Sequence, residues 1–339
     1  MHSLEGDPIQ HLDAVRGSSM PGHRSYADID YPWRAPAVPD ADAIEASARA
    51  WTAQRGLVPV PQLPRRFDPV NVGLLTSLCY AGATAERREL IAQLLAWIFV
   101  HDDVYDDATH DPERLHAVLA GYADTLRGAR EPFEDASPST RALVELRDRI
   151  AAVADPMWLD WFCESMRGFW LDGIVVETRI RAADTTPDVP TYLRMRMHSI
   201  GVLPFLDLVE LAHGFAIPRV VAADPSMMRL RMRTARVIAY ANDVFSYEKE
   251  RRAGDPNNLV HLLMHHDGLS LPGAVDRVIS LHDREVALFE SEAASIPFAS
   301  LPHVDQFIEG HRAWMRGALD WQRLSRRYST GRELLDARQ

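Results

Sequence analysis

Apolar residues recur at steps of three and four along most of the chain, which is the period of an amphipathic α-helix. Alternating runs of period two, which indicate strands, are nearly absent. The pattern predicts helices over 43–55, 69–80, 85–101, 112–126, 139–153, 157–179, 189–199, 201–213, 225–250, 258–267, 271–296 and 302–324. Roughly a dozen helices without an internal repeat predict one all-α domain over 41–339. It is larger than a four-helix bundle, and we expect it to enclose an apolar cavity.

The first forty residues follow a different pattern. They are polar and rich in proline, with Pro8, Pro21, Pro32, Pro36 and Pro39. We expect residues 1–40 to form an N-terminal arm that is irregular or ordered only by docking.

Composition narrows the classes of function. The chain has 339 residues with a net charge of −11, and this acidic balance argues against nucleic-acid binding, which relies on neutralising phosphates. No apolar run reaches the roughly 18 residues that a membrane span requires, and residues 1–18 lack a signal-peptide core. Two cysteines, Cys79 and Cys163, form neither a disulfide framework nor a zinc site, so we expect a reducing cytoplasm.

Four aspartates end the helix predicted over 85–101. Residues 94–107 read LLAWIFVHDDVYDD, which places Asp102, Asp103, Asp106 and Asp107 after an apolar run. Asp102 and Asp106 lie about 40° apart on a helix and share one face, and Phe99 points the same way.

Carboxylates at this place weaken a helix, because like charges one turn apart repel and the helix dipole disfavours anions at its C-terminus. A bound cation would offset both effects, and oxygen ligands of this kind suit Mg²⁺. The other interpretation is that the acids end the helix and face water. For such a short motif by itself, both interpretations stay open.

A second polar group occurs within the helix predicted over 225–250. Asn242, Ser246 and Glu250 step by four twice, so their side chains share one face. An amide oxygen, a hydroxyl and a carboxylate on one rigid helix are able to chelate one Mg²⁺. Lys249, the only lysine of the chain, adjoins them and is able to reach a phosphate oxygen. A merely polar helix face is the weaker interpretation, because the rest of this helix is apolar and buried polar groups need partners.

With both motifs in place, the chain resembles the bacterial class I terpene synthases. The Asn-Ser-Glu triad of that family is followed by Gly-Asp and Asn-Leu-Val, which here are 254–255 and 258–260. A diphosphate-sensing arginine precedes the triad's Asn by some 46 positions, where this chain has Arg196. Near its end the family carries an Arg-Tyr pair with a Trp seven before the Tyr, which here are Arg327, Tyr328 and Trp321. His101, before the aspartate pair, departs from the aromatic or aliphatic residue usual there, and Ser199 departs from Asp or Thr.

The resemblance implies the class I terpenoid synthase fold, a Mg²⁺-dependent reaction and a set of roles. Three Mg²⁺ ions are expected, with Mn²⁺ as a substitute; Asp102 would bridge two of them with help from Asp106, and the triad would hold the third. Asp103 would be either a further metal ligand or a partner of Arg327, and Asp107 is an extra acid beyond the family's pattern. The residues that the resemblance implies bind the diphosphate are Arg196, Lys249, Arg327 and Tyr328. Ser199, Ile200 and Gly201 would form the helix break, with Ile200 offering its carbonyl.

Aromatic residues are expected to line the cavity, because ring faces stabilise cations and exclude water. The candidates are Phe99, Phe169, Trp170, Phe245, Trp314 and Trp321, with plain core packing as the other interpretation. Phe99 and Trp321 are the favoured ones.

The resemblance implies a lyase that ionises a linear isoprenoid diphosphate and cyclises the carbocation. Farnesyl diphosphate (C15) is the favoured substrate, with geranylgeranyl diphosphate (C20) as the alternative and a homodimer as the default assembly. Two rivals are a chain-elongating prenyltransferase and a catalytically silent scaffold of the same fold. The first would carry a second aspartate-rich motif in place of Asn-Ser-Glu, and the second would have damaged ligand positions.

Overall fold

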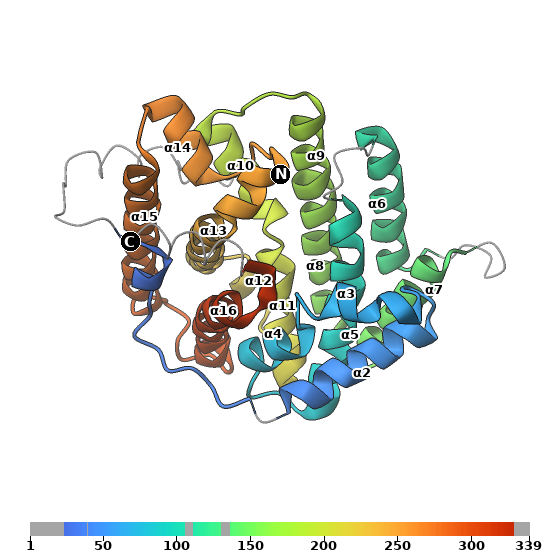
Figure 1. The fold of residues 1–339 in the computed structure, drawn as a ribbon. Coiled ribbons are helices and arrows are strands. Elements are labelled where there is room, and N and C mark those ends of the chain that lie inside the picture. Colours follow the sequence, from blue (N-terminus) through green and yellow to red (C-terminus); the bar gives the residue numbers. More distant parts are fainter. Residues whose placement is uncertain (1–23, 39, 106–110, 130–135, 329–339) are drawn as a thin grey trace.

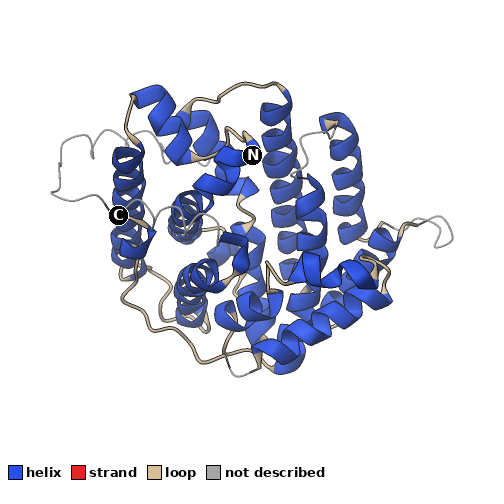
Figure 2. Cartoon of the chain, viewed as in Figure 1, coloured by secondary structure: helices blue, strands red, loops and turns tan. Residues whose placement is uncertain are grey.

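In the computed structural model, the described residues are 24–38, 40–105, 111–129 and 136–328, with only the backbone described at 66 and 102–105. Every regular element among them is a helix (Figures 1 and 2), so the prediction of an all-α fold is confirmed. The α-helices are α2 (Ala41–Gln54), α3 (Leu63–Phe67), α4 (Val72–Cys79), α5 (Ala85–Tyr105), α6 (Pro112–Arg127), α7 (Pro138–Ala151), α8 (Pro156–Arg167), α9 (Val175–Ala182), α10 (Val189–Ser199), α11 (Val202–His213), α12 (Arg219–Ala222), α13 (Pro225–Ala253), α14 (Leu259–Asp267), α15 (Leu271–Ala293) and α16 (Val304–Leu324). The other helical segments are η1 (Tyr26–Asp28), η2 (Val60–Gln62), η3 (Gly168–Ile174) and η4 (Arg326–Tyr328).

Many of these helices begin with the same local signal, an Asp or Ser cap followed by a proline in the first two helical positions. Asp111, Ser137, Asp155 and Asp224 each accept a hydrogen bond from a backbone N–H of the following helix, with proline next in sequence. The cap satisfies a donor that the helix leaves unpaired, and proline has no N–H to satisfy. The sequence therefore determines the starts of these helices locally.

Helix α13 lies inside the assembly and carries the second motif. It packs against α15, α16, α11, α10 and α14, while α4 joins α16 to α2 and α5 (Figure 1). Its residues Val237, Ala239 and Val244 are at most 1% exposed, so the motif side chains project from a helix held on several sides by core contacts.

The helix predicted over 157–179 runs through α8, η3 and α9, and η3 is a π-helical segment packed on α10. A Cβ on Gly173 would lie 2.6 Å from the backbone nitrogen of Ser199, so only glycine allows this approach. Between α10 and α11, Gly201 has a φ of 72°, which glycine adopts without strain. Segment η3 and the α10–α11 break therefore form one tightly packed unit.

The described part of the predicted N-terminal arm, residues 24–38, lies along the outside of α15 and α16 before the chain enters α2 (Figure 1). Arg24 forms an ion pair with Asp283 (2.8 Å), and the indole N–H of Trp33 donates to Glu290 (3.0 Å). These contacts show docking of that part; residues 1–23 and 39 lie outside the described residues. Among the described helices, none is both long and apolar enough to cross a membrane.

Candidate active site

A cavity of about 160 Å³ opens between α5, η3, the α10–α11 break, α13 and α16. Its lining has two chemical characters. The apolar part is formed by Leu75, Ile98, Phe99, Phe169, Ile200, Val202, Phe205, Ile238, Trp314, Ala318 and Trp321. The polar part is formed by Glu177, Arg196, Ser199, Asn242, Ser246, Lys249, Glu250, Gln322, Arg327 and Tyr328. Most of the predicted site residues whose side chains are described line this one cavity.

The triad residues Asn242, Ser246 and Glu250 occupy successive turns of α13 and all face the cavity. The Ser246 hydroxyl donates to the Asn242 carbonyl (2.7 Å), and the Asn242 side-chain amide donates to the Tyr328 hydroxyl (3.0 Å). Burial raises the pKa of the Glu250 carboxyl to about 7, because a carboxylate loses hydration in the cavity wall.

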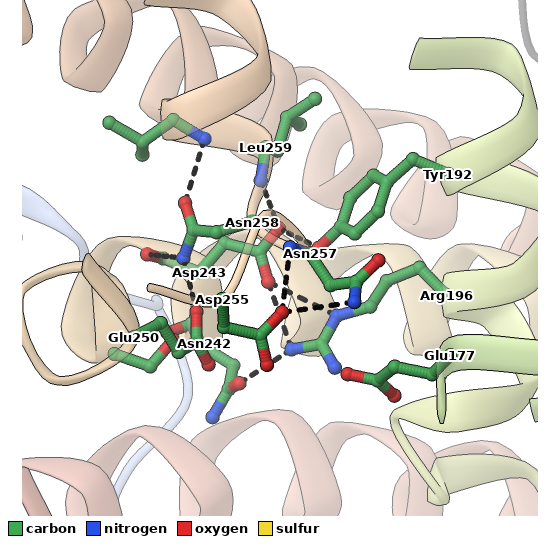
Figure 3. A network of polar contacts seen from close by, with 12 residues as sticks. Glu177, Tyr192, Arg196, Asn242, Asp243, Glu250, Asp255, Asn257, Asn258 and Leu259 are labelled. Carbon is green, nitrogen blue, oxygen red and sulfur yellow. Dashed lines mark hydrogen bonds and ion pairs between the residues drawn. The ribbon is translucent and has the colours of Figure 1, made fainter. Parts of the chain in front are cut away.

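Arg196, 7% exposed on α10, connects to α13 through two neighbouring side chains (Figure 3). One terminal nitrogen donates to Asn242 Oδ1 at 2.6 Å, and Nε donates to Asp243 Oδ1 at 3.1 Å. Asp243 is fully buried and also accepts from the Tyr192 hydroxyl (2.5 Å) and the Leu259 backbone N–H (3.0 Å). The guanidinium is thereby fixed in orientation at the edge of the cavity.

The loop that follows α13 holds Glu250 in place (Figure 3). Gly254, with a φ of 70°, ends the helix, and Asn258 then caps α14 by accepting from Val260 N–H (2.9 Å). The amide nitrogen of Asn258 donates both to the Asp243 carbonyl (2.8 Å) and to Glu250 Oε2 (2.7 Å). The Gly-Asp and Asn-Leu-Val motifs therefore orient the last residue of the triad.

Asp255 anchors the same loop to α9. Its carboxylate lies 2.9 Å from Arg181 and accepts from the Asn257 backbone N–H at 2.9 Å. The loop is thus connected to the helix that follows η3.

The C-terminal residues of the motif set close the cavity from α16 and η4. The indole N–H of Trp321 donates to the Val70 carbonyl (2.6 Å), and its ring contacts Phe99 (6.0 Å between centroids) and Tyr328 (5.6 Å). The Arg327 guanidinium lies 5.6 Å from the centre of the Phe99 ring. These contacts join η4 to α5 at the mouth of the cavity.

The first acidic motif follows Phe99 by three residues, at the end of α5. The backbone of Asp102 and Asp103 continues α5, but their side chains, together with Asp106 and Asp107, lie outside the described residues. His101, which departs from the family's usual residue type, anchors the end of α5: Nδ1 lies 2.6 Å from the Trp97 carbonyl and Nε2 lies 2.9 Å from Ser139 Oγ on α7.

The described donor set fits a divalent cation. Amide, hydroxyl and carboxylate oxygens from one face of α13 meet in one cavity, and these are oxygen ligands of the kind that Mg²⁺ prefers. Among the described side chains, no group of three His, Cys, Asp or Glu residues forms a further metal cluster.

The aromatic wall agrees with the prediction for Phe99, Phe169, Trp314 and Trp321, which line the cavity. Trp170 and Phe245 do not line the cavity and follow the other interpretation, packing in the core. The Trp170 ring contacts Trp97 (6.0 Å), and the Phe245 ring lies 5.3 Å from Tyr26 of the arm. Helical period alone does not say which neighbour an apolar face meets.

Sequence reasoning assigned no role to several residues that surround Arg196 and Glu250, among them Tyr192, Asp243 and Asn258. Asp243 sits directly after Asn242, and its charge in an apolar helix was the available signal, because a buried carboxylate needs partners. Tyr192 precedes Arg196 by one turn, but no local pattern predicts their shared partner on α13.

Comparison with known proteins agrees with this geometry. Residues 93–287 match the family model described as terpene synthase family 2, C-terminal metal binding. The chain is 32% identical to (+)-T-muurolol synthase from Roseiflexus castenholzii over 89% of this chain and 94% of that protein. It is 30% identical to germacrene A synthase from Nostoc punctiforme, over 85% and 90% of the two chains. The solved structure of a single-residue variant of cucumene synthase superposes with a TM-score of 0.77 at 30% identity, covering 88% of this chain and all of that one.

The matched segment contains both motif helices, α5 from Gln93 onward and all of α13. The resemblance inferred from the motifs is thereby confirmed: this chain belongs to terpene synthase family 2.

Proposed function

We propose that this terpene synthase is a Mg²⁺-dependent lyase that ionises a linear isoprenoid diphosphate, releases diphosphate and cyclises the carbocation to a hydrocarbon or alcohol. The observation that carries the proposal is one cavity that is lined both by cations and metal-type ligands and by aromatic and aliphatic side chains. An anionic leaving group and an apolar chain need these two environments side by side.

Farnesyl diphosphate is the proposed substrate, and geranylgeranyl diphosphate is the alternative. Support comes from the muurolol synthase relative, whose name specifies cyclisation of (2E,6E)-farnesyl diphosphate and which aligns over most of both chains. The chain-elongating prenyltransferase is disfavoured by the Asn-Ser-Glu triad.

The metal ligands and the diphosphate-binding residues have different roles in the proposed ionisation. Bound Mg²⁺, three ions by analogy with the family, would stabilise the charge that develops on the diphosphate oxygens. Asn242, Ser246 and Glu250 would hold one ion, with Asp102 and Asp106 as further ligands and Asp103 as either a ligand or an Arg327 partner. The hydrogen-bond donors to the diphosphate would come from Arg196, Lys249, Arg327 and Tyr328. The hydrogen bond to Asp243 orients the Arg196 guanidinium before substrate binds.

The apolar side of the cavity protects the cation. Phe99, Phe169, Phe205 and Trp321 exclude water, and a ring face stabilises a cation by about 0.5–2 kcal/mol. Ile200 and Gly201 form the α10–α11 break beside this wall, where the Ile200 carbonyl is the proposed effector of ionisation, with Ser199 as the linker residue.

We also propose a cytoplasmic protein acting as a homodimer and independent of nucleic acid. Both cysteines are buried and free, as suits a reducing compartment.

The test is incubation of the purified protein with C10, C15 and C20 diphosphates, with Mg²⁺, Mn²⁺ or EDTA, and GC-MS of the organic extract. A cyclic C15 product that disappears with EDTA is the expected result. Longer linear diphosphates would identify an elongating enzyme, and no turnover by folded protein with Mg²⁺ would contradict the proposal.

A further inference from the structure

The described part of the N-terminal arm, residues 24–38, is attached to α15 by specific polar contacts. Besides the ion pair of Arg24 given above, the Arg24 backbone N–H donates to Asp276 Oδ1 at 2.5 Å. Further along the arm, the Tyr31 hydroxyl lies 3.0 Å from Nε2 of His282, and both side chains are at most 6% exposed. Because buried polar groups are paired across this contact, the arm docks in one defined position.

The same arm also contacts α16, close to where that helix reaches the cavity. The Asp30 carboxylate lies 2.8 Å from the Arg316 guanidinium and 3.7 Å from that of Arg323. Arg323 also donates to the Ile29 carbonyl, and it follows Trp321 of the cavity wall by two residues. Among the described residues of the arm none lines the cavity, so the arm packs behind the wall and not inside it.

A row of three aromatic rings connects the arm to the polar side of the cavity. The Tyr26 ring lies 5.3 Å from the ring of Phe245 on α13, and the Phe245 ring lies 6.3 Å from that of Tyr328, at 67°. Phe245 is 2% exposed and stands between Asn242 and Ser246 in sequence. The Tyr328 hydroxyl in turn accepts the hydrogen bond from Asn242 described above.

Segment η4, which carries Tyr328, depends on such neighbours for its position. It is three residues long, and a helical segment this short is marginal by itself. The Arg327 backbone N–H donates outside the segment, to the Pro69 carbonyl at 3.0 Å, and the Tyr328 ring packs between Trp321 and Phe245. Removing support from behind Phe245 should therefore loosen Tyr328.

We propose that Tyr26 is a positioning residue: its ring packs on Phe245, which fixes Tyr328 beside Asn242 and so strengthens the binding of diphosphate. Tyr26 acts through these neighbours, because it does not line the cavity. The inference rests on the proposed function and extends it to a segment that the motif set leaves out.

The experiment uses the full chain with Mg²⁺ and the accepted isoprenoid diphosphate. It measures the inhibition constant of inorganic diphosphate and, separately, thermal unfolding. Tyr26→Ala removes the ring and Tyr26→Phe retains it. Phe215→Ala is the matched control, because Phe215 is also partly buried, stacks on His213 and His303 and does not line the cavity.

We expect Tyr26→Ala to raise the inhibition constant about fivefold, which is in the range that one aromatic pair contributes. Tyr26→Phe and Phe215→Ala should stay within about twofold of wild type, even where Phe215→Ala lowers the unfolding temperature as much as Tyr26→Ala does.

Tyr328→Phe tests the route, because it keeps the ring and removes the hydroxyl that accepts from Asn242. In this background Tyr26→Ala should change the inhibition constant by less than about twofold, since two changes that act through one contact are not additive.

An inhibition constant in Tyr26→Ala like that of wild type would overturn the role of Tyr26 and leave the proposed function standing. Equal losses in Tyr26→Phe and Tyr26→Ala would assign the effect to the hydroxyl and also overturn it, as would a full fivefold effect in the Tyr328→Phe background. Absence of diphosphate release by the wild type would overturn the proposed function itself.

Discussion

Arg196 contacts two consecutive side chains of α13, Asn242 and Asp243, through different nitrogens of one planar group. A lysine ammonium cannot reproduce this fork, and the buried Asp243 would lose a partner. We expect Arg196→Lys to lower kcat/KM at least about tenfold, equivalent to about 1.4 kcal/mol of transition-state stabilisation. Steady-state kinetics with the accepted substrate measure this.

Arg194→Lys is the matched control, because Arg194 is exposed on the same helix and its guanidinium contacts only Thr191 among the hydrogen bonds described. It should behave as wild type. Unchanged kinetics in Arg196→Lys would remove Arg196 from the diphosphate-binding role.

Asn242 joins the proposed metal ligands to Tyr328 and Arg196. Asn242→Ala removes a ligand oxygen but suits a helix, so far-UV circular dichroism should match wild type. Turnover should fall about 100-fold or more, since even outer-shell partners of a metal contribute roughly 10–100-fold. Product formation across a Mg²⁺ titration measures the loss, and turnover like that of wild type would contradict the metal assignment.

For individual residues, the sequence predicted which side chains share one face of a helix, because helical spacing determines this. It did not predict contacts between residues on different helices. Steps of four placed Asn242, Ser246 and Glu250 on one face, and the structure brings all three to the cavity. The shared partner of Tyr192 and Arg196 on another helix has no local signal, because the contacting residues of α10 and α13 are about 50 positions apart in sequence. The Asp102 side chain lies outside the described residues, so its role stays a prediction.

At the scale of elements, the contact between η3 and the α10–α11 break borders the cavity, because Phe169, Ser199 and Ile200 line it. Gly173 lets the two backbones meet, and a Cβ there would lie 2.6 Å from Ser199 N and 2.8 Å from the His198 carbonyl carbon. Backbone atoms cannot move away from an added Cβ as easily as the end of a flexible side chain can. Gly173→Ala should therefore push the break outward and destabilise the fold by about 1–3 kcal/mol, the usual cost of overpacking.

Thermal unfolding and the GC-MS product profile together test this, because a displaced break should also alter the products. Gly121→Ala is the control: Gly121 lies in α6 and a Cβ there would meet no other atom within 4 Å, so alanine should stabilise the protein slightly, by up to about 1 kcal/mol. Equal stability of Gly173→Ala and wild type would show that the break is not held by this contact.

The period of apolar residues did not predict every helix boundary or the shortest helices. The helix predicted from residue 69 begins at Val72, because Asn71 adopts a φ of 53° and its side chain caps the Leu74 N–H. Short helices α3 and α12 were missed, since four or five residues cannot display a period. The π-helical turn in η3 was missed because it depends on packing against α10.

For the whole molecule, the same apolar surface that builds the fold also buries ionisable groups, and His311 is the clearest case. It lies on α16 at 0% exposure, with Nδ1 2.9 Å from the Phe307 carbonyl. Burial lowers the pKa of His311 to about 3 from its ordinary 6.5, and the charges of Arg231 and Arg312 act in the same direction.

This difference makes stability depend on pH in a defined window. Between pH 6.5 and about 3 the unfolded chain binds a proton at His311 that the folded protein does not, so stability falls as pH falls. Above pH 6.5 the contribution is fully present. One such group changes the free energy of unfolding by at most about 1.4 kcal/mol per pH unit.

His311→Gln removes the titration while keeping an amide donor for the Phe307 carbonyl. Urea unfolding at pH 7, 6 and 5 should show a shallower loss of stability for this variant than for wild type, by up to about 1 kcal/mol per unit, whatever its stability at pH 7. His116→Gln, at a partly exposed position on α6, is the control variant. Parallel slopes for all three proteins would mean that His311 becomes protonated in the folded state, which would require a buried partner for Nε2, an atom without one among the described residues.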